Sequence, residues 1–328
     1  MWCHRVMTTR ELGRTGIHVS PIGLGCMQFS AQGILSGFFS PMSQPDADAI
    51  VKTALDGGIT LFDTAELYGR GESERRLAAG LTHAGISPGE VAVATKWRPV
   101  GRTAGSVART IDDRLCALNP FPIDLHQIHF GFGGLSPVRQ QVEAMAQLVQ
   151  AGKIRSVGVS NFTAKQMAAA HALLAEHGIP LASNQIQVNL LNRSVEFNGI
   201  LDTARGLGIT LIAYSPLRSG MLTGKFHDNR DLVASMPRLR RTVHGFTNTN
   251  LDRTAPLIDA MREIANTHQA SVGQVALAWL ITNYGDTVIA IPGASKPHHA
   301  AEAAGAMNVA LSAEETQRLT DLSSEVRK

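Results

Sequence analysis

The chain has 328 residues, of which 44% are hydrophobic and 17% charged, and its formal net charge is +3. This is enough apolar sequence for one large core, and α/β barrels of this size often form one unit, so we expect a single domain over residues 1–328. The weak, scattered positive charge suits an anionic small molecule or cofactor and argues against nucleic acid as a partner. The densest basic run, RLRR at 238–241, lies in a polar stretch typical of a solvated loop.

Cysteine use and hydropathy indicate a compartment. Cys3, Cys26 and Cys116 form no disulfide framework and no zinc motif, which favours a reducing cytoplasm. No apolar run reaches about 18 residues, so we expect no membrane span. Residues 1–6 lack the apolar core of a signal peptide, and residues 1–8 are predicted to be a flexible extension.

Short apolar runs alternate with longer amphipathic stretches along the chain. The runs are rich in Val and Ile, as strands buried on both faces are. The predicted strands are residues 18–27, 60–64, 91–97, 123–130, 154–161, 181–189, 210–217 and 288–294. The predicted helices include residues 46–56, 73–83, 138–150 and 164–177. Thr163 marks a helix start, and Gly152, Gly178 and Gly208 follow helix ends. Eight β-then-α units predict the α/β class and a (β/α)8 TIM barrel.

A Rossmann fold is the main alternative to the barrel. It requires GxGxxG after the first strand, and GLGCMQ at 23–28 lacks the last glycine and a following helix start. Two stretches interrupt the alternation: residues 30–44, with apolar residues at 34–39, and the polar, basic residues 226–253. In a barrel, long loops after the strands usually shape a substrate pocket.

Four polar residues stand at or just after the ends of three consecutive predicted strands. Asp63 ends the second strand, Lys96 the third and His129 the fourth, while Tyr68 follows Asp63 in the segment DTAELYG at 63–69. The carboxyl ends of barrel strands meet at one mouth, so we expect these side chains to converge.

Acid–base chemistry suggests a role for each of the four. We expect Lys96 to stabilise the tyrosinate of Tyr68 and lower its pKa, and Asp63 to keep Lys96 charged and oriented. Tyr68 then protonates a carbonyl oxygen that His129 orients, while a cofactor supplies hydride to the carbon. Glu66 is interpreted as a structural residue.

Each of these residues alone would more often be structural, and only the set of four favours catalysis. His126 and His129 form an HxxH pair, but that spacing on a strand places them on opposite faces. The same doubt applies to His298 and His299, so no metal site is expected.

The motifs together resemble the aldo-keto reductase superfamily over residues 9–324. Those that match in order are DTAELYG (63–69), ATK (94–96), QIH (127–129), GVSNF (158–162) and IPG (291–293). The resemblance implies a barrel with an N-terminal β-hairpin and long βα loops. It also implies NADPH-dependent reduction of aldehydes or ketones with Asp63, Tyr68, Lys96 and His129 as the catalytic tetrad.

The resemblance further implies a set of cofactor contacts. Ser160, Asn161 and Gln185 would bind the nicotinamide amide, and Tyr214 would stack on its ring. The remaining implied contacts, including those to the pyrophosphate and the adenosine end, are Met27, Asp63, Ser215, Leu217, Gly220, Lys225, Gly293, Ser295, His299 and Glu302. The chain departs from many relatives at His299 and Ala303, so Ser295, Lys296 and Lys225, together with His299, are expected to hold the 2′-phosphate, with NADPH favoured over NADH.

Two alternatives stay open. This superfamily also contains channel β-subunits, so a cofactor-binding sensor subunit with little turnover is the second hypothesis. An aldolase-type barrel that uses Lys96 as a Schiff base is the third. For a carbonyl or alcohol substrate, the expected pocket residues are Phe29, residues 34–39, Trp97, Phe130 and residues 226–253.

Overall fold

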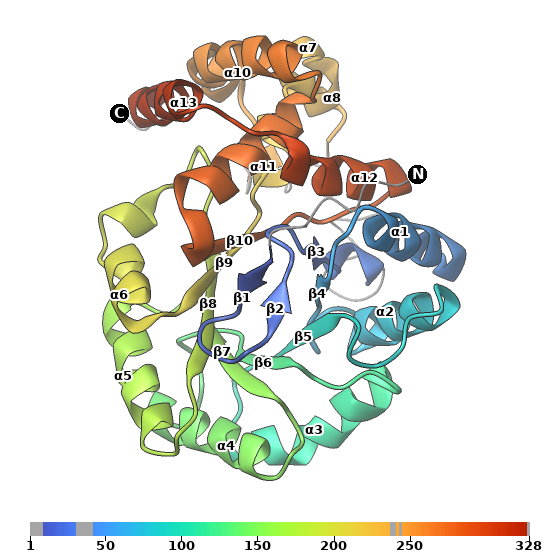
Figure 1. The fold of residues 1–328 in the computed structure, drawn as a ribbon, viewed down its shortest axis with the longest axis vertical. Coiled ribbons are helices and arrows are strands. Elements are labelled where there is room, and N and C mark those ends of the chain that lie inside the picture. The colour runs from blue at the N-terminus through green and yellow to red at the C-terminus, as the bar shows by residue number, and fades with distance from the viewer. Residues whose placement is uncertain (1–8, 31–41, 237–240, 243–244, 327–328) are drawn as a thin grey trace.

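The computed structural model describes residues 9–30, 42–236, 241–242 and 245–326, in which eight parallel strands form the centre and helices surround them (Figure 1). The strands are β3 (Leu24–Gly25), β4 (Leu61–Asp63), β5 (Ala92–Trp97), β6 (Leu125–Ile128), β7 (Ser156–Ser160), β8 (Leu181–Gln187), β9 (Thr210–Tyr214) and β10 (Val288–Ile291). Parallel bridges from Ile22 to Ala290 and from Gly25 to Gly293 join the first strand to the last. The sheet therefore closes into the predicted barrel.

Helices lie around the outside of the barrel, most of them between successive strands. They are α1 (Gln44–Asp56), α2 (Glu72–His83), α3 (Gly105–Leu118), α4 (Val138–Gln150), α5 (Ala164–Ala175), α6 (Ile200–Leu207), α7 (Lys225–Asp228), α8 (Asp231–Ala234), α10 (Asn248–His268), α11 (Val272–Asn283), α12 (Pro297–Gly305) and α13 (Ala313–Val326). None of the helices in the described part of the chain is long and apolar enough to cross a membrane.

Local sequence signals set several helix ends. The Thr163 hydroxyl accepts a hydrogen bond from the Gln166 N–H, and Gln166 Oε1 accepts one from the Thr163 N–H, so a capping box starts α5. Gly152, Gly178 and Gly208 follow helices with φ values of 67°, 70° and 68°. Glycine adopts this left-handed conformation without steric cost, which confirms the predicted helix ends.

An antiparallel hairpin, β1 (Arg10–Glu11) and β2 (His18–Val19), covers the amino-terminal end of the barrel. Its apolar residues Leu12, Ile17 and Val19 pack against inward-facing strand residues that include Leu61 and Leu125. Gly13, at the turn, has φ +61°, and a Cβ there would lie 2.6 Å from the Ala182 carbonyl oxygen. The hairpin can approach this closely only because that residue is glycine.

Two sequence predictions need correction. The strand predicted at 18–27 is two separate strands, β2 in the hairpin and β3 in the barrel. The loop predicted at 226–253 contains α7 and α8, and α10 already begins at Asn248, where Thr247 caps the helix by accepting from the Asn250 N–H. The predicted extension at 1–8, the apolar residues 34–39 and residues 238–240 of the basic run lie outside the described residues.

Candidate active site

The four predicted catalytic residues meet at the carboxyl ends of adjacent strands. Asp63 ends β4, Lys96 lies in β5, and His129 follows β6 directly. Tyr68 comes from the segment between β4 and α2, and its ring and the His129 ring are nearly perpendicular, with centroids 5.9 Å apart at 83°. The parallel register, in which Asp63 pairs with Ala94 and Lys96 with Gln127, produces this convergence.

Lys96 is fully buried, and its charge is matched by Asp63. Its Nζ donates to Asp63 Oδ1 and, at 2.7 Å, to the Thr64 carbonyl oxygen. Burial lowers the pKa of Lys96, but Asp63 and Tyr68 raise it, and the balance leaves this pKa above its ordinary value. The site therefore holds an ammonium ion in the barrel interior.

Asp63 is also held by two amides. Its Oδ2 accepts from Gln185 Nε2 at 2.9 Å and from Gln127 Nε2 at 3.1 Å. The sequence analysis missed Gln127, although it lies two residues before His129 and so on the same face of its strand. One carboxylate thereby links four barrel strands.

Tyr68 lies beside the Lys96 ammonium, with Nζ 5.1 Å from its ring centroid. Burial raises the pKa of the Tyr68 hydroxyl, the charge of Lys96 and a hydrogen bond from it lower this pKa, and Asp63 raises it. Lys96 therefore lowers this pKa as expected, but burial outweighs Lys96 and the net direction is upward. Tyr68 thus holds its proton at neutral pH, as a proton donor must.

His129 is a neutral imidazole. Burial and the nearby charges of Lys96 and Arg98 lower its pKa well below the ordinary value. The Phe130 ring stacks on it with a centroid distance of 4.5 Å and an interplanar angle of 3°. On the opposite face of the strand, burial and then the charge of Arg114 lower the pKa of His126 to about 3. The two histidines therefore do not share a site.

Several predicted cofactor contacts form a connected row beside the tetrad. The Tyr214 hydroxyl donates to Asn161 Oδ1 at 3.0 Å, and Asn161 Nδ2 donates to Ser160 Oγ at 3.0 Å. Ser160 Oγ donates to the backbone oxygen of Gln185 at 2.9 Å. The Gln185 side chain points instead to Asp63, and its Nε2 donates to the Asp63 carboxylate.

The other predicted cofactor contacts lie in segments that follow β3, β9 and β10. Met27 begins a short 3-10 helix (η1, Met27–Phe29), and Gly293 bridges to Gly25. Ser215 and Gly220 have left-handed backbones, with φ of 49° and 92°, in a turn that contains Leu217. This turn leads to Lys225 at the start of α7.

A group of basic side chains joins two of these segments. His299 Nδ1 lies 3.3 Å from Ser295 Oγ. Burial lowers the pKa of His299, and the charges of His298, Lys225 and Lys296 lower it further. Glu302 is exposed on α12. The charged side chains of Lys225 and Lys296 therefore lie near His299.

The pocket predictions are corrected in part. Trp97 alternates with Lys96 along β5, so it points outward, where its Nε1 donates to Ser106 of α3 at 3.1 Å. Phe29 is also fully buried in the main core. Phe226 of the 226–253 segment packs against Phe246 in a small core of its own. Phe130 is the predicted pocket residue that lies against the tetrad.

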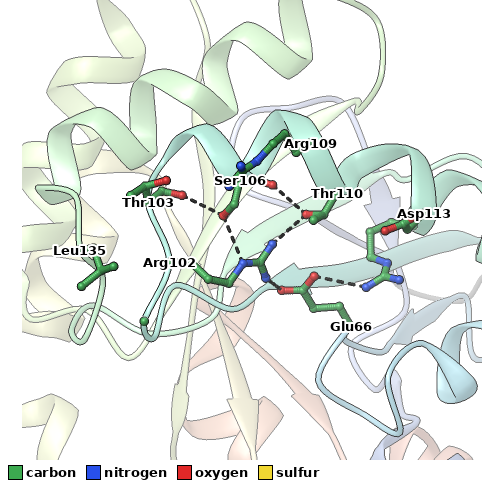
Figure 2. Close-up of a pocket in the computed structure, with 10 residues that line it drawn as sticks. Glu66, Arg102, Thr103, Ser106, Arg109, Thr110, Asp113 and Leu135 are labelled. Atoms are coloured by element: carbon green, nitrogen blue, oxygen red, sulfur yellow. Dashed lines mark hydrogen bonds and ion pairs between the residues drawn. The ribbon is translucent and has the colours of Figure 1, made fainter.

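A cavity of about 460 Å³ lies beside α3 rather than at the tetrad (Figure 2). Its described lining includes Glu66, Arg102, Ser106, Thr110 and Arg114. Arg102 hydrogen-bonds Glu66, Ser106 and Thr110, and Arg114 contacts Glu66. The Glu66 carboxylate is therefore held by arginine side chains and does not contact Asp63.

The fold and site define a (β/α)8 barrel with an Asp–Tyr–Lys–His group at its mouth. The sequence profile of the aldo/keto reductase family matches residues 21–324, and this chain belongs to that family of oxidoreductases. It is 32% identical to the chloroplastic pyridoxal reductase of Arabidopsis thaliana over 314 residues, 92% of this chain and 83% of the reductase. It is 33% identical to an aldo-keto reductase of Strobilurus tenacellus, over 97% of this chain and 93% of that protein.

Solved structures agree with this assignment. The glycerol dehydrogenase of Gluconobacter oxydans superposes with a TM-score of 0.82 at 28% identity, covering 99% of this chain and 98% of that one. An aldo/keto reductase from Klebsiella pneumoniae in complex with NADP and acetate superposes with a TM-score of 0.72 at 25% identity, covering 95% and 94%.

Proposed function

We propose that this protein catalyses NADP(H)-dependent reduction of an aldehyde or ketone to an alcohol, or the reverse oxidation. The observation that carries the proposal is the buried Lys96 ammonium between the Asp63 carboxylate and the Tyr68 hydroxyl. Burial of two charges costs desolvation energy, so a buried ion pair is weak evidence for stability and points instead to a functional role. Structural neighbours bound to NADP and NADPH support the choice of cofactor.

The residues present fit a nicotinamide dinucleotide phosphate. Ser160 and Asn161 offer neutral hydrogen-bonding groups beside the tetrad, which suit an uncharged amide. The basic region of Lys225, Lys296 and His299 suits a phosphate. Gln28 Oε1 is buried without a partner among the described residues, next to Gly293, as a polar group awaiting a ligand would be.

When bound, NADPH supplies a hydride to the carbonyl carbon. The Tyr68 hydroxyl donates its proton to the carbonyl oxygen, and Lys96 stabilises the phenolate that remains. An N–H of neutral His129 donates a hydrogen bond to the same oxygen and orients it. Asp63 keeps the ammonium of Lys96 charged and in place.

Removal of the Tyr68 hydroxyl tests the mechanism. Tyr68→Phe should lower the rate of NADPH-dependent carbonyl reduction by about 10²-fold or more, because the proton donor is lost, while NADPH binding stays nearly intact. The measurements are initial rates over a carbonyl panel and fluorescence titration with NADPH. Full turnover in the variant would remove Tyr68 from this role. A kcat/KM for NADH at or above that for NADPH would contradict the cofactor preference.

A further inference from the structure

One carboxylate, Glu66, attaches the segment that carries Tyr68 to the end of β5. Its Oε1 accepts from the backbone N–H of Arg98 at 2.6 Å and from the Arg102 guanidinium, and its Oε2 accepts from Arg114 Nη1 at 3.2 Å. Glu66 is only 9% exposed. Charge-assisted bonds in such surroundings are the stronger kind of hydrogen bond.

The main chain of Glu66 is held by the same strand. Its N–H donates to the Lys96 carbonyl oxygen at 3.3 Å, and its carbonyl oxygen accepts from the Gly71 N–H at 3.1 Å. Tyr68 lies within the turn that this second bond closes. Both the side chain and the backbone of Glu66 therefore connect the Tyr68 turn to β5.

The same group of charged residues also contacts Thr95, the residue before Lys96, on the outer face of the barrel. Thr95 points away from the interior and donates to Glu74 Oε1 at 2.6 Å. Glu74 Oε2 lies 3.0 Å from Arg114 Nε. Arg114 thus bridges two carboxylates, one two residues before Tyr68 and one bound to the residue before Lys96.

The cavity in Figure 2 is lined by Arg102, Arg109 and Arg114, and two of these, Arg102 and Arg114, already bind Glu66. Arg102 donates to Glu66, to Ser106 at 3.1 Å and to Thr110 at 2.9 Å, and the figure shows its guanidinium turned toward these groups. These bonds leave it directed at protein atoms. The arrangement serves to hold Glu66.

We propose that Glu66 is a positioning residue: its carboxylate, held by Arg98 N–H, Arg102 and Arg114, fixes the Tyr68 turn against the strand that carries Lys96. The inference rests on the proposed function, because it assumes that Tyr68 donates the proton. A loose turn would let the hydroxyl move away from the substrate oxygen, and a misplacement of about 1 Å can cost about 10²-fold in rate.

The first test measures the turn without any catalysis. Glu66→Gln removes the charge and keeps the shape, and hydrogen exchange of residues 63–71 should become at least about threefold faster. Glu72→Gln is the matched control, since Glu72 also binds two arginines, Arg75 and Arg76, but on the surface of α2. Unchanged exchange in Glu66→Gln, or an equal increase in the control, would overturn the proposal.

The second test asks whether Glu66 acts through Tyr68. With the best carbonyl substrate from the panel, Glu66→Gln should lower kcat about tenfold and leave the KM for NADPH unchanged. In a Tyr68→Phe background the same change should alter the residual rate by less than about twofold. Equal losses in both backgrounds would mean a general structural role and would overturn the proposal.

Further outcomes separate the two proposals. If Glu66→Gln does not fold, Arg102→Gln removes the support from the other side and is expected to give the same exchange and the same rate pattern. If the wild-type protein reduces no carbonyl compound with NADPH, the proposed function fails. The exchange measurement then still decides whether Glu66 holds the turn.

Discussion

Replacement of Lys96 should lower both the stability and the activity of the protein, and a second replacement at Asp63 should restore only the stability. Lys96→Met replaces the ammonium with an apolar side chain of similar length. Asp63 would then keep its hydrogen bonds from Gln127 and Gln185 but lose its only described cationic partner. The variant should be both unstable and inactive, for two different reasons.

The magnitude follows from burial. Lys96 is fully buried, and the Asp63 side chain is 3% exposed. Removal of one partner of a buried ion pair typically costs about 3–5 kcal/mol, because an uncompensated charge remains. Replacement of both partners by neutral groups is often neutral or stabilising. The double variant Asp63→Asn/Lys96→Met should therefore recover about 2 kcal/mol or more relative to Lys96→Met.

The assay is equilibrium urea unfolding of the wild type and both variants, with NADPH-dependent reduction measured in parallel. Activity should fall by about 10²-fold or more in both variants, since neither has a cation beside Tyr68. The reasoning is refuted if Lys96→Met unfolds within about 1 kcal/mol of the wild type. It is also refuted if the double variant is no more stable than the single one.

Two further predictions concern pH and cofactor choice. Burial raises the pKa of Glu74 from 4.5 to about 7. The protonated Glu74 carboxyl therefore contributes fully to the free energy of unfolding below pH 4.5, and this contribution is lost as the pH rises through 7. Glu74→Gln should therefore gain stability relative to the wild type, by up to about 3 kcal/mol between pH 4.5 and pH 8; urea unfolding at both pH values checks this, and a constant difference would contradict it. Lys225→Met should raise the KM for NADPH about tenfold and change the KM for NADH little, because one cation is lost from the basic region around His299; an equal rise for both cofactors would refute that placement.

The barrel, and the convergence of Asp63, Tyr68, Lys96 and His129 at its mouth, could be predicted from local pattern. Continuous apolar runs ending in Asp63 and Lys96 identified the strands and the edge where they meet. The regular spacing of the units then placed His129 at the same edge. Such features depend on strand period and order, which sequence records directly.

The failures arose where a side chain's surroundings decide its role. Trp97 follows Lys96, and strict alternation along the strand would have directed it outward. The pKa of Tyr68 depends on how completely burial offsets the charge of Lys96, which sequence does not record. Glu66 binds Arg102 and Arg114, 36 and 48 residues away, and no local signal connects them.

The β1–β2 hairpin limits the directions from which a molecule can reach the active site. It closes one end of the barrel, so every molecule that reaches Lys96 enters and leaves past the loops at the opposite end. If the proposed cofactor and substrate both bind at that end, the one bound more deeply must bind first and leave last. Substitutions in those loops can therefore slow turnover by delaying departure, even when the four reacting side chains are untouched.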